Sequence, residues 1–182
     1  MGKGTNIVLI GMPGAGKSTV GVVAAKMLGM DFLDCDLVIQ GMYHATLEQL
    51  IAERGAEGFL RLENDVLCGI ACERTLIATG GSAVYSDDAM AHLGGGGTLV
   101  YLKVEPAELE QRLGSLIERG VVMRDGSIAT LASLFAEREP LYEKWADVNL
   151  ETAGLSLRET AEALAQKFGR DCASGTSGLQ EW

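Results

Sequence analysis

The stretch NIVLIGMPGAGKS, residues 6–18, contains the phosphate-binding pattern G-x-x-x-x-G-K-[ST] at every fixed position. Residues 6–10 form an apolar run suited to a buried parallel strand, and residues 18–28 alternate small and apolar side chains as a packed helix does. A strand, a glycine-rich loop and a helix in this order turn backbone N–H groups toward one point, where an anion can bind. The sequence therefore predicts a nucleoside triphosphate site.

The residues of this loop have separate expected roles. Gly14 and Gly16 lack a Cβ, so the backbone can approach phosphate oxygens closely. Lys17 is expected to reach the β- and γ-phosphates, and the Ser18 hydroxyl is expected to bind Mg²⁺. The predicted ATP-binding residues of the loop are Gly14, Ala15, Gly16, Lys17, Ser18 and Thr19.

Length, charge and cysteine content narrow the function classes. The chain has 182 residues, which fits one domain, and a formal net charge of −10. This acidity argues against a nucleic-acid partner, because such sites cluster Lys and Arg, but it allows a small anionic substrate. No signal-peptide pattern or membrane-length apolar run is visible, and the four cysteines lack zinc-site spacing. We therefore expect a cytoplasmic monomer with reduced thiols and no membrane partner.

Strand-like runs alternate with helical stretches along the chain. Strands separated by helices predict an α/β fold, in which a mainly parallel five-stranded sheet carries helices on both faces. Ligands then bind at the carboxyl ends of the strands. The expected strands are 7–10, 31–34, 75–79, 98–104 and 147–150.

Three glycine-containing segments are expected to be irregular. Residues 94–97 are four consecutive glycines and predict a mobile turn before the fourth strand, while residues 114–128 predict a mobile lid. The single domain is expected to span residues 1–168, followed by a flexible tail over 169–182 that is rich in Gly, Ser and Thr.

Two aspartates flank Cys35 at the end of the second expected strand. In an extended segment Asp34 and Asp36 would point to the same face, toward the phosphate loop. Phosphoryl transfer needs a carboxylate that orients the metal and a group that positions or deprotonates the acceptor hydroxyl. Aspartates at strand ends also cap a following helix, so both interpretations of the pair stay open at this point.

Over residues 5–168 the sequence resembles the shikimate kinase family. The resemblance implies a three-layer α/β/α P-loop kinase of the nucleoside monophosphate kinase-like fold. It also implies transfer of a phosphoryl group from ATP, with Mg²⁺, to a hydroxyl of shikimate, a step of aromatic amino-acid biosynthesis. It rests on Gly11–Thr19, Asp34-Cys35-Asp36, Phe59 and Glu63, Gly80-Gly81, Arg119, and Arg138 ahead of Leu141-Tyr142.

The same resemblance implies roles around the acceptor. Asp34 would help to hold Mg²⁺ through water, and Asp36 would accept the hydrogen bond of the reacting hydroxyl. Gly80 and Gly81 would bring backbone against the acceptor, and Arg138 would pair with its carboxylate. Because Arg138 lies among glutamates in the sequence, exposed ion pairs are the alternative role for it.

Two further arginines are implied on the nucleotide side. Arg112 falls where the family has an arginine packed on adenine, and Arg119 would come from the lid to the transferring phosphate. Together with Lys17 and Asp36, Arg119 completes the expected catalytic set. Solvated charges at helix ends are the alternative for Arg112 and Arg119.

The sequence departs from the family pattern on the acceptor side. Leu60 stands where the family has an arginine that binds the acceptor carboxylate, and Ser82 stands where it has a third glycine. The lid also differs, because Arg119 is followed by Gly-Val and not by Pro-Leu. Arg61 lies about 100° further around a helix than position 60 and cannot simply replace the missing arginine.

Loss of a charge-assisted hydrogen bond costs about 1.5–3 kcal/mol, which weakens acceptor binding by roughly 10- to 150-fold. Three outcomes remain open from the sequence: weak shikimate binding, compensation by Arg61 or another cation, or a less anionic hydroxylated acceptor. A nucleotide-binding relative without catalytic activity is a further alternative, although such a protein would not need Asp34, Asp36, Arg119 and Arg138 together.

Overall fold

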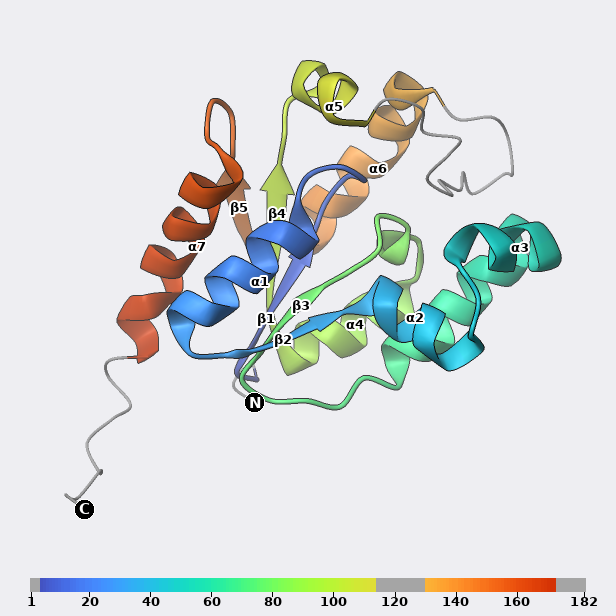
Figure 1. Ribbon diagram of the computed structural model, residues 1–182, viewed down its shortest axis with the longest axis horizontal. Helices are drawn as coiled ribbons and strands as arrows, with labels where there is room; N and C mark the ends of the chain where they lie inside the picture. The colour runs from blue at the N-terminus through green and yellow to red at the C-terminus, as the bar shows by residue number, and fades with distance from the viewer. Residues whose placement is uncertain (1–3, 114–129, 173–182) are drawn as a thin grey trace.

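Five parallel strands form one sheet in the order β2-β3-β1-β4-β5 (Figure 1). The structure is a computed structural model that describes residues 4–113 and 130–172. The five-stranded parallel sheet predicted from the sequence is confirmed, with strand ends shifted by a residue or two. The strands are β1 (Asn6–Ile10), β2 (Asp31–Asp34), β3 (Thr75–Ala78), β4 (Gly97–Lys103) and β5 (Val148–Glu151).

Helices cover both faces of this sheet, so the fold has three layers. In the view of Figure 1, α1 and α7 pack against each other in front of the sheet, and α4 and α6 lie behind it. Within the described ranges, no helix is long and apolar enough to cross a bilayer. The helices are α1 (Lys17–Leu28), α2 (Cys35–Tyr43), α3 (Leu47–Cys68), the short 3₁₀ helix η1 (Ala83–Tyr85), α4 (Asp87–Gly96), α5 (Pro106–Leu113), α6 (Leu131–Trp145) and α7 (Leu157–Cys172).

The main core lies around β1, the central strand, whose five residues are all buried. Their apolar side chains pack with Val20 and Ala24 of α1 on one face and with residues of α4 and β4. A second apolar cluster joins α2 to α3 through Ile39, Leu50 and Phe59. Because α2 and α3 each carry a side chain of the site described below, this second cluster positions that part of the site.

The expectation of a mobile turn over residues 94–97 is wrong. Gly94 to Gly96 form the last turn of α4, and Gly97 begins β4 with an extended backbone. A Cβ on Gly97 would lie 2.4 Å from the backbone oxygen of Asn6, so the glycine allows close pairing with β1 and does not make a mobile turn. At the other end, α7 continues to Cys172, so residues 169–172 are helical.

Candidate active site

The phosphate-binding loop connects the end of β1 at Ile10 to the start of α1 at Lys17. Gly11, Gly14 and Gly16 all have φ angles between +77° and +144°, a region that favours glycine. A Cβ on Gly16 would lie only 2.5 Å from the side chain of Leu157, at the start of α7. The loop therefore needs its glycines for both conformation and space, and its shape fits the phosphates of a nucleotide at the N-terminus of α1.

Lys17 is buried at the start of α1, with 7% of its surface exposed. Its Nζ donates hydrogen bonds to the backbone oxygens of Gly11 and Met12 at 2.7 and 2.9 Å. Burial lowers the pKa of Lys17 to about 8, although the nearby carboxylate of Asp36 acts in the opposite direction. The loop thus holds an ammonium group within reach of the predicted phosphate site.

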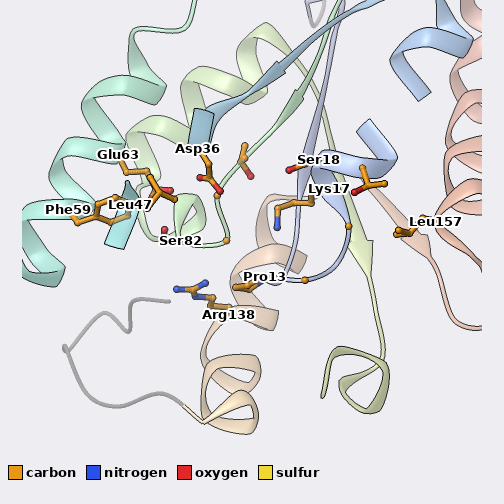
Figure 2. A pocket seen from close by; sticks show the side chains of 16 residues that line it. Pro13, Lys17, Ser18, Asp36, Leu47, Phe59, Glu63, Ser82, Arg138 and Leu157 are labelled. Atoms are coloured by element: carbon orange, nitrogen blue, oxygen red, sulfur yellow. The ribbon is translucent and has the colours of Figure 1, made fainter. Parts of the chain in front are cut away.

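A cavity of about 600 Å³ opens beside this loop at the carboxyl ends of β1 and β3 (Figure 2). Lys17 and Ser18 line it from the loop side, and Arg138 lines it from α6. Asp36 of α2, Glu63 of α3 and the turn Gly80 to Ser82 after β3 complete the wall opposite the loop. The structure therefore brings the predicted phosphate site and most of the predicted acceptor residues into one cavity.

The aspartate pair is not arranged as the extended geometry predicts. The chain turns into α2 directly after Asp34, whose Oδ1 accepts hydrogen bonds from the backbone N–H groups of Asp36 (3.0 Å) and Leu37 (3.3 Å). Asp34 thus caps the helix, as the alternative interpretation allowed, and only Asp36 is among the residues that line the cavity. The expectation of a shared extended face is wrong, because the favourable N-cap at Asp34 starts the helix one residue later.

Gly80 lies between two carboxyl groups. A Cβ at this position would lie 2.5 Å from Oε1 of Glu63 and 2.9 Å from Oδ1 of Asp36. The pKa of Asp36 is raised, mainly by burial and further by Asp34, while Lys17 lowers it. Two carboxyl groups from different helices therefore approach one glycine at the wall of the cavity.

Arg138 is almost completely buried on α6, with 1% of its surface exposed. Its Nε donates a 3.0 Å hydrogen bond to the Tyr85 hydroxyl, and its guanidinium lies 4.8 Å from the centre of that ring. A Cβ on Gly81 would lie 2.9 Å from Nη1 of Arg138. The alternative of exposed ion pairs is wrong for Arg138, because this face of α6 packs inward although its glutamate neighbours lie nearer to solvent.

The Mg²⁺ site that the resemblance implies would use Ser18 and Asp34. Within residues 4–113 and 130–172, no group of three His, Cys, Asp or Glu side chains is placed to hold a metal ion. Ser18 lines the cavity next to the phosphate loop, and Asp34 lies close enough to influence the pKa of Lys17. This set fits Mg²⁺, which is held through few protein ligands together with phosphate oxygens and water.

The family model for shikimate kinase matches residues 13–169 of this chain. The chain belongs to the shikimate kinase family. It is similar to the shikimate kinase of Parabacteroides distasonis, with 41% identity over 76% of this chain and 83% of the relative. The shikimate kinase of Nitrosospira multiformis is 37% identical over 90% of this chain and 84% of the relative.

Solved shikimate kinases have the same fold. The enzyme from Acinetobacter baumannii in complex with shikimate superposes with a TM-score of 0.80 at 31% identity, covering 96% of each chain. The enzyme from Aquifex aeolicus gives a TM-score of 0.77 at 26% identity, over 94% of this chain and all of the other. The expected fold class, a three-layer P-loop kinase, is thus confirmed, and the chain is an ATP-dependent kinase.

Leu60, at which this member of the shikimate kinase family departs from the family pattern, belongs to α3. Leu60 does not line the main cavity but a neighbouring one of about 370 Å³, which shares Glu63 and Ser82 with the first. Arg61 is exposed and forms an ion pair with Glu57 on the same helix. Arg61 lines this smaller cavity together with Leu60 and is not among the residues that line the main cavity.

Some predicted residues lie outside what the structure describes. Arg119 and the predicted lid over residues 114–128 are outside the described ranges, and so is the remaining tail, residues 173–182. Arg112 belongs to α5, but its side chain is not described. The expected roles of Arg112 and Arg119 stay predictions.

Sequence reasoning gave no role to two tyrosines that hold the acceptor side. Tyr142 is fully buried, stacks on Tyr101 at 5.0 Å, and donates a 2.7 Å hydrogen bond to the backbone oxygen of Gly81. Tyr85 binds Arg138 as described above. The spacing of Arg138 and Tyr142, four residues apart on one helix face, is the signal that could have linked Tyr142 to the site.

Replacing Tyr85→Phe should raise the KM for the acceptor about 3- to 10-fold and leave kcat and the KM for ATP nearly unchanged. The ring would still stack on Arg138, but the hydrogen bond that orients the guanidinium would be lost. Steady-state kinetics measure this, with Tyr43→Phe as the matched control, because Tyr43 also stacks on an arginine, but that arginine, Arg54, does not line the cavity. An equal effect of both substitutions would contradict the role of Tyr85.

Proposed function

We propose that this chain transfers the γ-phosphoryl group of ATP to a hydroxyl of shikimate and forms shikimate 3-phosphate. The observation that carries the proposal is the cavity in which the buried guanidinium of Arg138 lies with Asp36 and the phosphate loop. A carboxylate-bearing alcohol fits between them, with its carboxylate toward Arg138 and a hydroxyl toward Asp36. Membership of the shikimate kinase family supports this choice of acceptor.

In the proposed reaction each residue has one task. Asp36 accepts the hydrogen bond of the attacking hydroxyl and takes up its proton as the new O–P bond forms, while the bond between the γ-phosphorus and its bridging oxygen breaks and ADP leaves. Lys17 neutralises the charge on the transferred group, which also needs Arg119 from the segment after α5. Gly80 and Gly81 form the backbone wall against the acceptor.

The nucleotide is held by the loop residues Gly14 to Thr19, and Arg112 is proposed to pack on the adenine. Ser18, and Asp34 through water, would hold Mg²⁺, which when bound would supply positive charge against the phosphates. We also propose a monomer in the cytoplasm. The free thiols of Cys35, Cys68 and Cys72 support a reducing location.

The test is ADP release by the purified protein with Mg²⁺-ATP, with and without millimolar shikimate, together with mass determination of the product. Shikimate-dependent turnover with a product one phosphoryl group heavier is expected. Because Leu60 contributes no cation, the KM should exceed that of a Leu60→Arg variant by roughly 10- to 150-fold. ADP release that does not depend on shikimate would overturn the proposal.

Leu60 favours one alternative, a kinase for a less anionic hydroxylated acceptor. The same assay with a cyclic polyol of similar size but without a carboxylate separates the two. Higher kcat/KM for the uncharged alcohol than for shikimate would favour the alternative, and the reverse order would favour shikimate.

A further inference from the structure

The two departures of this chain on the acceptor side meet at one carboxyl group. Leu60 and Glu63 lie three residues apart on α3, a spacing that puts both on one helix face. Both line the smaller cavity together with Ser82, and the Ser82 hydroxyl hydrogen-bonds the Glu63 carboxylate. Glu63 is 3% exposed, so very little of its surface is open to bulk water.

Charged groups reach Glu63 from several elements. Asp36 of α2 approaches it across Gly80, as the two short distances from the Gly80 Cβ position require. The cations facing it among the described residues are Lys17, from the phosphate loop, and Arg138, from α6. The further titratable groups around it are Cys35 of α2, Tyr142 of α6, Glu57 and Arg61 of its own helix, and Asp88 of α4.

The balance of these groups leaves Glu63 able to change its charge near neutral pH. Burial raises the pKa of Glu63 to about 7, and Asp36 adds to the rise. The hydrogen bond from Ser82 and the charges of Arg138 and Lys17 act in the opposite direction without offsetting the burial.

We propose that Glu63 determines acceptor specificity by taking up one proton from solvent when a carboxylate-bearing acceptor enters the cavity. This inference rests on the proposed function. An incoming carboxylate adds a negative charge to a cavity wall that already holds Asp36 and Glu63 side by side. Protonation of Glu63 removes one of these charges and turns its carboxyl group into a hydrogen-bond donor.

The sign of the pH effect follows from linkage. Below neutral pH Glu63 is already protonated, and the anionic acceptor binds best. As the pH rises above about 7, binding must include the uptake of a proton, so the affinity falls by up to about 10-fold per pH unit. The KM for shikimate should therefore rise between pH 6 and 9. An uncharged cyclic alcohol should show little of this dependence.

Three variants separate Glu63 from other groups that titrate in this range, such as Lys17. Glu63→Gln cannot ionise, so the rise in KM for shikimate with pH should be lost. Leu60→Arg places a cation beside Glu63 that keeps it ionised with and without acceptor, so the KM should be lower than that of the wild type above pH 7 and nearly independent of pH. Leu60→Met keeps the position apolar at similar volume, and the wild-type pH dependence should remain.

The deciding experiment is titration calorimetry of shikimate into the protein at pH 7.5, in buffers with different ionisation enthalpies, because this measures the protons taken up. A large fraction of one proton is expected for the wild type and for Leu60→Met, and close to none for Glu63→Gln and Leu60→Arg. Turnover of shikimate without proton uptake and with a flat KM would overturn the inference but leave the proposed function standing. Neither binding nor turnover of shikimate between pH 6 and 9 would overturn both.

Discussion

Asp36→Asn should lower kcat with the acceptor by about 10²- to 10⁴-fold, the range for loss of a general base, and leave ATP binding nearly unchanged. Asparagine keeps the size of the side chain but cannot take the proton of the attacking hydroxyl. Asp36 lines the cavity from the first turn of α2, where the cap at Asp34 fixes the backbone, so the variant should keep its geometry. Single-turnover phosphoryl transfer and nucleotide titration measure the two effects separately.

Asp31→Asn is the matched control, because Asp31 lies at the opposite end of β2 and is exposed. This control should keep wild-type turnover and melting temperature. If Asp36→Asn also kept full turnover on its acceptor, the hydroxyl would not need this carboxylate, and the proposed role would be wrong.

Lys17→Met should reduce kcat by about 10²- to 10³-fold and also weaken ATP binding. Its ammonium group lies at the phosphate loop, and loss of one preorganised donor to a developing charge has an effect of this size. The stability of the fold should not fall in parallel with activity. Since burial lowers the pKa of Lys17 to about 8, the charged form is disfavoured in the folded chain, and an apolar side chain of similar length removes that penalty.

We therefore expect the melting temperature of Lys17→Met to equal or exceed that of the wild type at pH 7, while activity is nearly lost. Lys26→Met is the matched control on the same helix, because Lys26 is exposed near its end. A Lys17 variant that loses both stability and activity in proportion would indicate a structural role and would contradict this prediction.

The parts of the fold that follow from short-range rules could be predicted from the sequence. The phosphate loop is specified by glycines that adopt positive φ angles. The buried strands are short apolar runs, which can be recognised without knowing which strands they pair with. Gly94 to Gly97 show where such rules fail. Glycine is flexible as an isolated residue, but here the close approach of Asn6 to Gly97 selects a regular conformation that only the assembled sheet explains.

The acceptor side of the site was less predictable, because its residues are positioned by tertiary packing. Only the family resemblance distinguishes Arg138 from its charged neighbours in the sequence, and its burial against Tyr85 follows from tertiary packing. Glu63 belongs to the family pattern, but its approach to Gly80 and its hydrogen bond from Ser82 arise because α3 meets the turn after β3 in space. Local spacing could not predict the shifted pKa, which is a property of this arrangement.

The central place of β1 has a consequence for how the protein matures on the ribosome. β1 is synthesised first, but its two neighbours in the sheet, β3 and β4, begin only at Thr75 and Gly97. The loop that follows β1 also packs against Leu157, at the start of α7. The nascent chain therefore carries its nucleotide-binding motif well before that site can be completed, because β3, β4 and Leu157 must all emerge after it.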